Sequence, residues 1–212
     1  MASFSEATCE AILSKAKDTQ SFVDFARTHL ARVYPKGRRV LSENFDPTPL
    51  FNIGCQLVAL NYQTPDKYRF YNLSKFAQNG NCGYVLKPRI LREGFNFSRP
   101  DPNLRCRVLV KIISGQHIPT RSAVVDPYVE VKIIGHPTDE KSYQTTFAKQ
   151  NGFSPNWRQT FEFEVNVPDL AQLVFILMSD SYSGQFTKPE RRNSIKQYVE
   201  YGPQPRTGGQ LN

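Results

Sequence analysis

The chain has 212 residues, enough for one large domain or two small ones. Its hydrophobic content of 39% and mean hydropathy of −0.49 allow a buried core but predict that part of the chain stays outside it. The formal net charge of +8 favours an anionic partner, although the 27 basic residues form no long block and equally suit a solvated surface. No apolar signal region or membrane-spanning stretch is present, so neither secretion by a signal peptide nor a membrane span is expected.

The four cysteines lie far apart and form no CxxC pair, which argues against a zinc site. Cys9, Cys55 and Cys106 have apolar neighbours and are predicted to be small core residues. This usage fits a reducing, cytosolic compartment.

The N-terminal segment is predicted to be helical. Ser3 with Glu6 matches a capping box, which predicts a helix through about Lys15. Apolar residues at helical spacing predict a second helix from about Gln20 to Ala31, ended by the breakers that follow.

Beyond this point strand-like patterns alternate with helical ones. The apolar run 53–62 suits either a helix end or a parallel strand buried on both faces, and a short helix is expected near 73–77. The glycine-rich turn in 79–88 leads to a predicted strand, Gly83–Leu86. Residues 1–90 therefore predict a parallel α/β arrangement with about two strands, too few for a closed barrel.

The second part of the chain has a different period. Residues 91–104 are predicted to be a linker, and residues 105–187 alternate apolar and polar side chains without a helical pattern. Such alternation predicts an antiparallel sandwich, with an additional strand near 173–178. Residues 188–212 are expected to be disordered or loosely attached. The inward-facing sets are Val108, Val110 and Ile112; Val129, Val131 and Ile133; and Phe161, Phe163 and Val165.

Several segments stand in a recognisable order. In the first part they are 3–6, 29–35, 54–65 and 79–88, and in the second 113–116, 125–127, 151–153, 167–171 and 184–187. In this order the chain resembles the end of a phosphoinositide-specific phospholipase C. The resemblance implies an α/β plus all-β fold: the C-terminal part of the Y half of a TIM barrel, followed by a C2 sandwich that is incomplete at its C-terminus.

The family resemblance implies hydrolysis of phosphatidylinositol 4,5-bisphosphate to diacylglycerol and inositol trisphosphate. The two catalytic histidines and the catalytic calcium ligands of that reaction belong to the X half, so no catalytic residue is assigned in this chain, which we expect to be inactive alone. His29 is predicted to be a packed helix residue, and His117 and His136 to be solvated loop residues.

The resemblance assigns Ser3, Arg32 and Tyr34 to substrate binding. A guanidinium grips a ring phosphate with two parallel hydrogen bonds, a hydroxyl adds a neutral donor, and a tyrosine ring packs against the sugar. The alternative for the Arg-Val-Tyr-Pro segment is a helix end whose cation the helix dipole favours. Lys36, Arg38 and Arg39 are taken as surface residues.

The C2 resemblance assigns Asp126 to calcium binding, although the sequence departs from the family pattern. Gln150 stands where the family has asparagine, and the loop 178–185 is short and keeps at most Asp180 as an acid. Calcium prefers six to eight oxygen ligands, so we expect weak or no calcium binding. The alternative is that Asp126 is a turn residue before a proline.

Two functions remain open from the sequence. The first is a piece of a phosphoinositide phospholipase C, whose partners are phosphatidylinositol 4,5-bisphosphate, an anionic membrane surface and a separate X-half chain. The second is a non-catalytic C2-like module that binds membrane or protein. Nucleic acid is not favoured, because no basic recognition helix or stacking motif accompanies the charge. The expected location is cytoplasmic, peripheral at a membrane.

Overall fold

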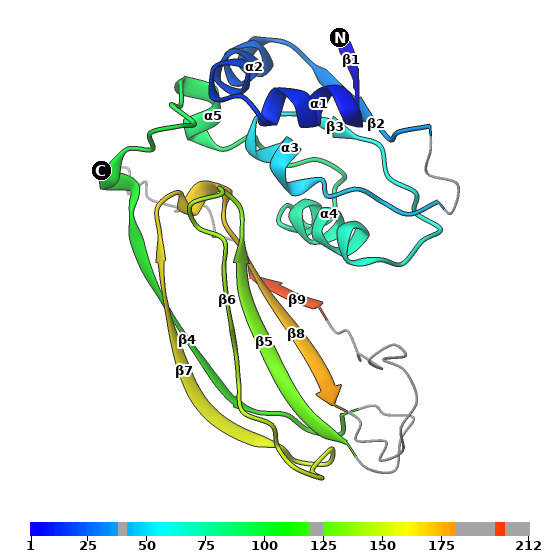
Figure 1. Cartoon of the computed structure of the whole chain (residues 1–212), viewed down its shortest axis with the longest axis vertical. Helices are drawn as coiled ribbons and strands as arrows, with labels where there is room; N and C mark the ends of the chain where they lie inside the picture. Colours follow the sequence, from blue (N-terminus) through cyan, green and yellow to red (C-terminus); the bar gives the residue numbers. More distant parts are fainter. Residues whose placement is uncertain (38–41, 119–124, 181–197, 202–212) are drawn as a thin grey trace, which may run out of the picture.

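The computed structural model describes residues 1–37, 42–118, 125–180 and 198–201. These residues form an α/β half, at the top of Figure 1, and an elongated β-sandwich below it. None of the helices in the described ranges is long and apolar enough to cross a membrane.

The α/β half is built on a three-stranded parallel sheet in the order β1-β2-β3. The helices α1 and α2 connect β1 to β2 and lie against one face of this sheet (Figure 1). The α/β prediction is confirmed, with three strands in place of about two. The elements are β1 (Ala2–Ser5), α1 (Glu6–Leu13), α2 (Ala16–Thr28), β2 (Ala31–Tyr34), α3 (Thr48–Asn52), β3 (Leu57–Val58), α4 (Lys67–Ala77) and α5 (Arg89–Glu93).

The predicted start of the first helix was wrong by two residues. Ser5, not Ser3, is the N-cap of α1, and its side chain accepts a hydrogen bond from Thr8 N at 3.1 Å. Ser3 lies in β1 instead. Either serine precedes a run of helix formers, so the sequence alone did not distinguish the two caps.

The predicted second helix also ended too late. α2 ends at Thr28, and His29 already has extended backbone angles. Ala31 and Val33 are fully buried, while Arg32 between them is half-buried, which is the two-residue period of a strand. The helix-end alternative for the Arg-Val-Tyr-Pro segment is therefore wrong.

The N-cap of α4 is Asp66, whose carboxylate is bound by two backbone N–H groups. Asp66 accepts hydrogen bonds from Arg69 N at 2.9 Å and from Asn44 N at 3.0 Å. Burial raises the pKa of Asp66, but these donors outweigh burial and hold the pKa below its ordinary value. The ionised carboxylate therefore stabilises the folded chain.

We expect Asp66→Ala to lower the free energy of unfolding near pH 7 by about 1 kcal/mol. Because the folded-state pKa is lowered, this contribution is present above the ordinary pKa, near pH 4, and is lost as the pH falls through the folded-state value. Urea unfolding of both proteins at several pH values measures it. If the difference in unfolding free energy between the two proteins grew on acidification, the lowered pKa of Asp66 would be contradicted.

The predicted strand Gly83–Leu86 is absent: residues 84–88 are irregular backbone. Tyr84 is 72% and Leu86 77% exposed. A strand needs a ladder partner, and no described strand lies beyond β3 on that side. The segment 84–88 is instead held in place by Lys87, whose Nζ donates a hydrogen bond to Ala26 O near the C-terminus of α2.

Residues 91–104, predicted to be a linker, are partly packed against the α/β half. Leu91 and Phe95 are 2% and 6% exposed and belong to the core of the α/β half, so part of the predicted linker is packed. The same core contains Val167 and Leu170 from the sandwich.

The sandwich consists of a two-stranded antiparallel sheet, β4-β7, and a four-stranded antiparallel sheet, β6-β5-β8-β9. The four predicted strands are confirmed and are longer than predicted. Two strands were missed: β6 has a single apolar residue, Tyr143, and β9 lies in the predicted disordered tail, the rest of which falls outside the described residues. The bounds are β4 (Cys106–Ser114), β5 (Asp126–Ile134), β6 (Lys141–Gln144), β7 (Asn156–Val165), β8 (Gln172–Asp180) and β9 (Tyr198–Tyr201), with short 3-10 helices at Pro102–Leu104 and Pro168–Leu170.

The cysteine prediction holds for two of its three residues. Cys9 and Cys55 are buried in the α/β core, where burial raises the pKa of the Cys9 thiol to about 11. Cys106 is exposed, because it is the first residue of β4, where the core does not cover it.

The two halves share a second apolar contact. Tyr71 and Tyr68 of α4 pack against the outer face of the larger sheet, at Ile134, Val174 and Ile176. Helix α4 therefore covers the outer face of β8, and the sandwich is joined to the α/β half at two places.

Candidate functional site

The sheet of the α/β half has one covered and one open face. Ala31 and Val33 point to the helices, and the alternation of a strand turns Arg32 and Tyr34 to the opposite face. The parallel register places Ser3 beside Arg32, and Arg32 beside Leu57. The structure therefore brings the three predicted substrate-binding residues onto one open face.

Arg32 is half-buried and has no hydrogen bond or ion pair to any described side chain. Its guanidinium carbon lies 5.8 Å from the centre of the Tyr34 ring, a cation–π contact that leaves its N–H donors unused. Tyr34 is 40% exposed. A guanidinium with free donors next to an aromatic ring is suited to bind a phosphate.

A groove of about 770 Å³ opens beside this face. Arg32, Gln56 and Lys87 contribute polar groups to it, and the residues 83–88 form one wall. Its apolar lining residues include Leu57 (45% exposed), Leu73 (38%), Tyr84 and Leu86. The groove combines positive charge with uncovered apolar surface.

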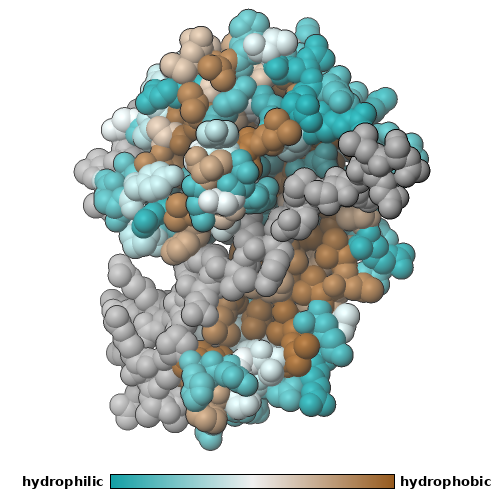
Figure 2. Space-filling view, turned by 180° about the vertical axis from the view of Figure 1, so that it is seen from behind, coloured by the Kyte–Doolittle hydropathy of each residue, from teal (hydrophilic) through white to brown (hydrophobic). Residues whose placement is uncertain are grey.

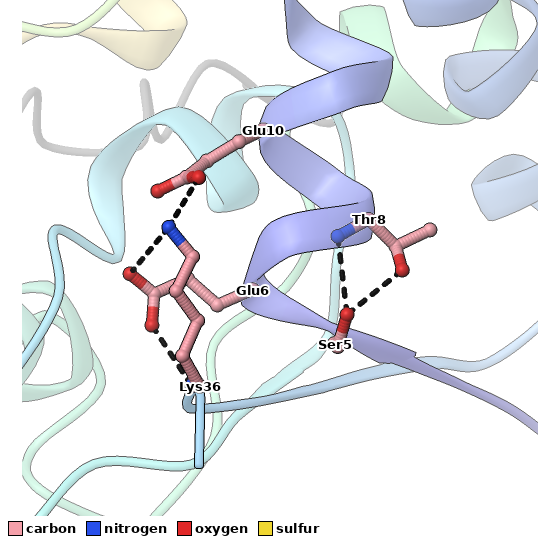
Figure 3. Close-up of polar contacts among 5 residues, drawn as sticks. All are labelled: Ser5, Glu6, Thr8, Glu10 and Lys36. Atoms are coloured by element: carbon pink, nitrogen blue, oxygen red, sulfur yellow. Dashed lines mark hydrogen bonds and ion pairs between the residues drawn. The ribbon is translucent and has the colours of Figure 1, made fainter. Parts of the chain in front are cut away.

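Lys36, predicted to be a surface residue, is partly exposed and is held in ion pairs. Its backbone N–H donates to Glu6 Oε2 at 3.0 Å, its ammonium lies 3.9 Å from Glu6 Oε1, and the same ammonium binds Glu10 Oε2 (Figure 3). Glu6 is buried, and the adjacent cap of Thr8 by Ser5 fixes the start of α1. Lys36 is thus neutralised, while Arg38 and Arg39 lie outside the described residues.

Two family models match the chain. The Y domain of phosphatidylinositol-specific phospholipase C matches residues 1–90, and the C2 domain matches residues 106–190. The chain belongs to the phosphatidylinositol-specific phospholipase C family. The α/β half is its Y domain, and the sandwich its C2 domain.

Known relatives agree with both matches. The chain is 41% identical over 189 residues to 1-phosphatidylinositol 4,5-bisphosphate phosphodiesterase eta-2 of Mus musculus, covering 84% of this chain and 12% of that protein. It is 40% identical over 185 residues to inactive phospholipase C-like protein 2 of Homo sapiens, covering 79% and 16%. The crystal structure of S. officinalis PLC21 superposes with a TM-score of 0.74 and 36% identity, covering 85% and 24%. The chain thus spans a quarter or less of these relatives.

The three histidines lie away from the open face. His29 was predicted to be a packed helix residue: its ring does stack on Phe25 at 4.6 Å, but it is exposed and lies one residue past the end of α2. His117 is exposed, as predicted, and its ring contacts Phe153. His136 is 3% exposed, so the prediction that it is solvated is wrong: Nε2 lies 2.8 Å from Phe97 O and Nδ1 lies 2.8 Å from Thr138 Oγ1.

Asp126, the predicted calcium ligand, begins β5 and accepts a hydrogen bond from Gln150 N at 2.7 Å. Its backbone pairs with that of Asp180. Among the residues that the structure describes, no three His, Cys, Asp or Glu side chains converge as a metal site. These residues do not fit the oxygen-rich shell that calcium prefers.

The sequence did not single out the groove. Gln56 and Leu57 are consecutive at the start of β3, but Lys87 comes from a distant segment, and nothing local marks it as their neighbour. The one local feature that could have pointed to the groove was the Lys87-Pro88 pair at the end of the run 79–88.

Proposed function

We propose that this chain supplies the headgroup-holding side of a phosphoinositide phospholipase C. The observation that carries the proposal is the half-buried Arg32, which has no carboxylate partner among the described residues and stands between Ser3 and Tyr34 on an open sheet face. The ligand is the phosphorylated inositol ring of phosphatidylinositol 4,5-bisphosphate, and the chain acts at the surface of the membrane that contains it, on the cytoplasmic side.

Each of the three side chains has a chemical task. Arg32 binds a ring phosphate through paired N–H donors, Ser3 donates a hydrogen bond from its hydroxyl, and the ring of Tyr34 covers the sugar. None of the three is assigned a proton-transfer role, and the histidines of the described residues lie elsewhere. Binding of the substrate and orientation of its ring are therefore the roles proposed for this chain.

The three parallel strands are interpreted as part of a TIM barrel. A barrel closes only when every edge strand has a neighbour, and β3 has an uncovered edge in the described residues. The apolar groove beside it offers the surface that the remaining strands would cover. Catalytic groups and catalytic calcium belong to that complementary half.

The purified 212-residue chain is expected to show no turnover of phosphatidylinositol 4,5-bisphosphate, because it would hold the ring while none of its described residues is placed to protonate or deprotonate the ring. Release of inositol trisphosphate from vesicles in the presence of calcium measures this. A full-length phospholipase C serves as the positive control. Turnover well above the buffer background would refute the proposed division of roles.

Arg32→Gln is expected to weaken binding of soluble inositol trisphosphate by about 10- to 100-fold, because a charge-assisted pair of hydrogen bonds is lost. Arg27→Gln is the matched control, since Arg27 is exposed on α2, the helix that covers the opposite face of the sheet. Isothermal titration of the three proteins measures the affinities. Equal losses for both variants would mean that only net charge matters.

The alternative is a non-catalytic module that binds membrane or protein through its C2 domain. It is favoured by the sequence similarity to relatives that are named inactive. Vesicle binding that depends on phosphatidylinositol 4,5-bisphosphate and is lost in Arg32→Gln supports the first function. Binding to any anionic vesicle, unaffected by this substitution, supports the second.

A further inference from the structure

The side chains proposed to hold the headgroup have few neighbours of their own. Tyr34 is 40% exposed, and Arg32 is half-buried beside the Tyr34 ring. In the view from behind in Figure 2, the Y domain presents hydrophilic residues with scattered apolar ones, whereas a broad apolar area lies on the sandwich. A strand side chain outside a core takes its direction from the backbone that carries it. The direction of Tyr34 therefore depends on what fixes the end of β2.

The pairing of β2 with β1 ends at Tyr34. The last pair in the register is Ser5 with Tyr34. Pro35 follows and has no N–H to donate. β1 ends at the same level, because the chain enters α1 at Glu6. The strand pairing thus stops at the residue whose direction matters for binding.

A side chain replaces the next rung of this ladder. Ala2 N donates to Leu30 O at 2.9 Å, and in a parallel ladder every second residue repeats such a bond, so the N–H of Lys36 is the next to face the end of β1. The carbonyl of Glu6 is not available there, because it is directed along the axis of α1. Instead Glu6 Oε2 accepts from Lys36 N at 3.0 Å (Figure 3). Glu6 therefore joins the C-terminal ends of β1 and β2.

Burial and charge strengthen this contact. Glu6 is 4% exposed, so water competes little for its carboxylate. The Lys36 ammonium lies 3.9 Å from Glu6 Oε1 and also binds Glu10 Oε2. Glu6 is the first residue of α1, where the helix dipole favours a negative charge. Because two carboxylates hold the Lys36 ammonium, Lys36 is not suited to bind a phosphate.

On its other side β2 is fixed by β3, but only as far as Val33. Arg32 and Val33 pair with β3, and Ala59 N donates to Val33 O at 2.9 Å. Without the Glu6 contact, neither neighbouring strand would hold the backbone beyond Tyr34. The last residue of a strand frays readily when nothing beyond it is fixed.

We propose that Glu6 is a positioning residue for headgroup binding. Its carboxylate holds the N–H of Lys36 and thereby orients the ring of Tyr34, and with it the adjacent guanidinium of Arg32, toward the phosphorylated inositol ring. Glu6 itself touches neither the phosphates nor the sugar. The inference rests on the proposed function, because it requires Arg32 and Tyr34 to contact the headgroup.

A purely structural role for Glu6 makes a different prediction. Loss of Glu6 would then lower the stability of the chain but leave the affinity of the folded protein unchanged. A positioning role lowers the affinity of the folded protein and is restored by any side chain that returns an acceptor to the same place.

The test measures binding of soluble inositol trisphosphate to the full 212-residue chain by isothermal titration, on proteins shown to be folded by circular dichroism. Glu6→Ala removes the acceptor, and Glu6→Gln keeps an oxygen in its place. Glu10→Ala is the matched control, because it removes an exposed carboxylate that pairs with the ammonium of Lys36 but not with its N–H. Hydrogen exchange of the Lys36 amide, followed by NMR, reports the contact directly.

We expect Glu6→Ala to weaken binding about tenfold and to speed exchange of the Lys36 amide, and Glu6→Gln to return both to within about threefold of the unsubstituted chain. Glu10→Ala should change neither. In a Tyr34→Leu background, Glu6→Ala should cause no further loss of affinity, because the ring that it orients is gone. Full affinity in Glu6→Ala, or an equal loss in Glu6→Ala and Glu6→Gln, would overturn the proposal.

Lys36→Pro decides the question if Glu6→Ala does not fold. It removes the same hydrogen bond from the donor side at a partly exposed residue, and Lys36→Gln, which keeps the N–H, is its control. Lys36→Pro should weaken binding as Glu6→Ala does, and full affinity would overturn the proposal. Absence of binding by the unsubstituted chain would refute the proposed function and the positioning role together. Binding that Arg32→Gln weakens but Lys36→Pro does not would refute the positioning role alone.

Discussion

Replacing Asp139 by alanine is expected to destabilise the chain by about 3 kcal/mol. Asp139 is 2% exposed, and its carboxylate accepts hydrogen bonds from Asn166 N at 2.8 Å, from Asn166 Nδ2 at 2.7 Å and from Val167 N at 2.8 Å. Val167 is fully buried, so its N–H has no access to water once the acceptor is removed.

The matched control is Asp101→Ala. Asp101 also accepts from the backbone and side-chain nitrogens of one asparagine, Asn103, both at 2.9 Å, but it is exposed. Water replaces the lost acceptor there, so the expected loss is below about 1 kcal/mol. Urea unfolding monitored by circular dichroism compares the two variants. Similar losses would show that burial does not govern the effect.

Asp139 also affects the contact between the domains. The segment that it holds leads directly to Val167 and Leu170, which are buried in the core of the Y domain. Asp139→Ala should therefore loosen the C2 domain from the Y domain in addition to weakening the sandwich. Faster proteolysis within residues 91–104 would report this second effect.

The strands of the sandwich were predictable because their signal is local. Val129, Val131 and Ile133 alternate with polar residues, and one buried face fixes this period regardless of the partner strand. β6 was missed because Lys141–Gln144 lies at a sheet edge and contributes only Tyr143 to the core. Its pairing with β5, not its composition, makes it a strand.

The errors in the Y domain arise from contacts that the sequence does not contain locally. Gly83–Leu86 has a strand-like composition, but no described strand lies beside it to form a ladder. Ala31–Tyr34 continues the helical spacing of α2, yet pairing with β1 and β3 makes it a strand. His136 falls in a loop, and only the packing of the two domains buries it.

The candidate site was only partly predictable for the same reason. Ser3, Arg32 and Tyr34 were chosen by family resemblance, and the structure places them on one face of the sheet. Their role in substrate binding stays a prediction. The adjacent groove could not be predicted, since it is built from segments distant in sequence that meet only in the folded chain.

The junction between the domains also depends on a glycine. Gly135 follows β5 directly, and a Cβ added there would lie 2.8 Å from Leu170 O and 3.0 Å from Ala171 Cα. Both are backbone atoms, so no side-chain rotation relieves the overlap. Gly135→Ala is therefore expected to displace the segment that carries Leu170, and to destabilise the chain by about 3 kcal/mol.

Gly37→Ala provides the control for this substitution, because a Cβ at Gly37 would meet nothing within 4 Å. It should leave the free energy of unfolding unchanged within about 0.5 kcal/mol. Gly135 belongs to the C2 domain, but Leu170 is part of the Y-domain core. If the junction couples the domains, Gly135→Ala should therefore also lower the urea midpoint at which the Y domain unfolds. A probe at Cys82, which is exposed in the Y domain, can be compared with Trp157 emission from the C2 domain. Loss of stability seen by Trp157 alone would mean that the two domains fold independently, and that Leu170 fills the Y-domain core without stabilising it.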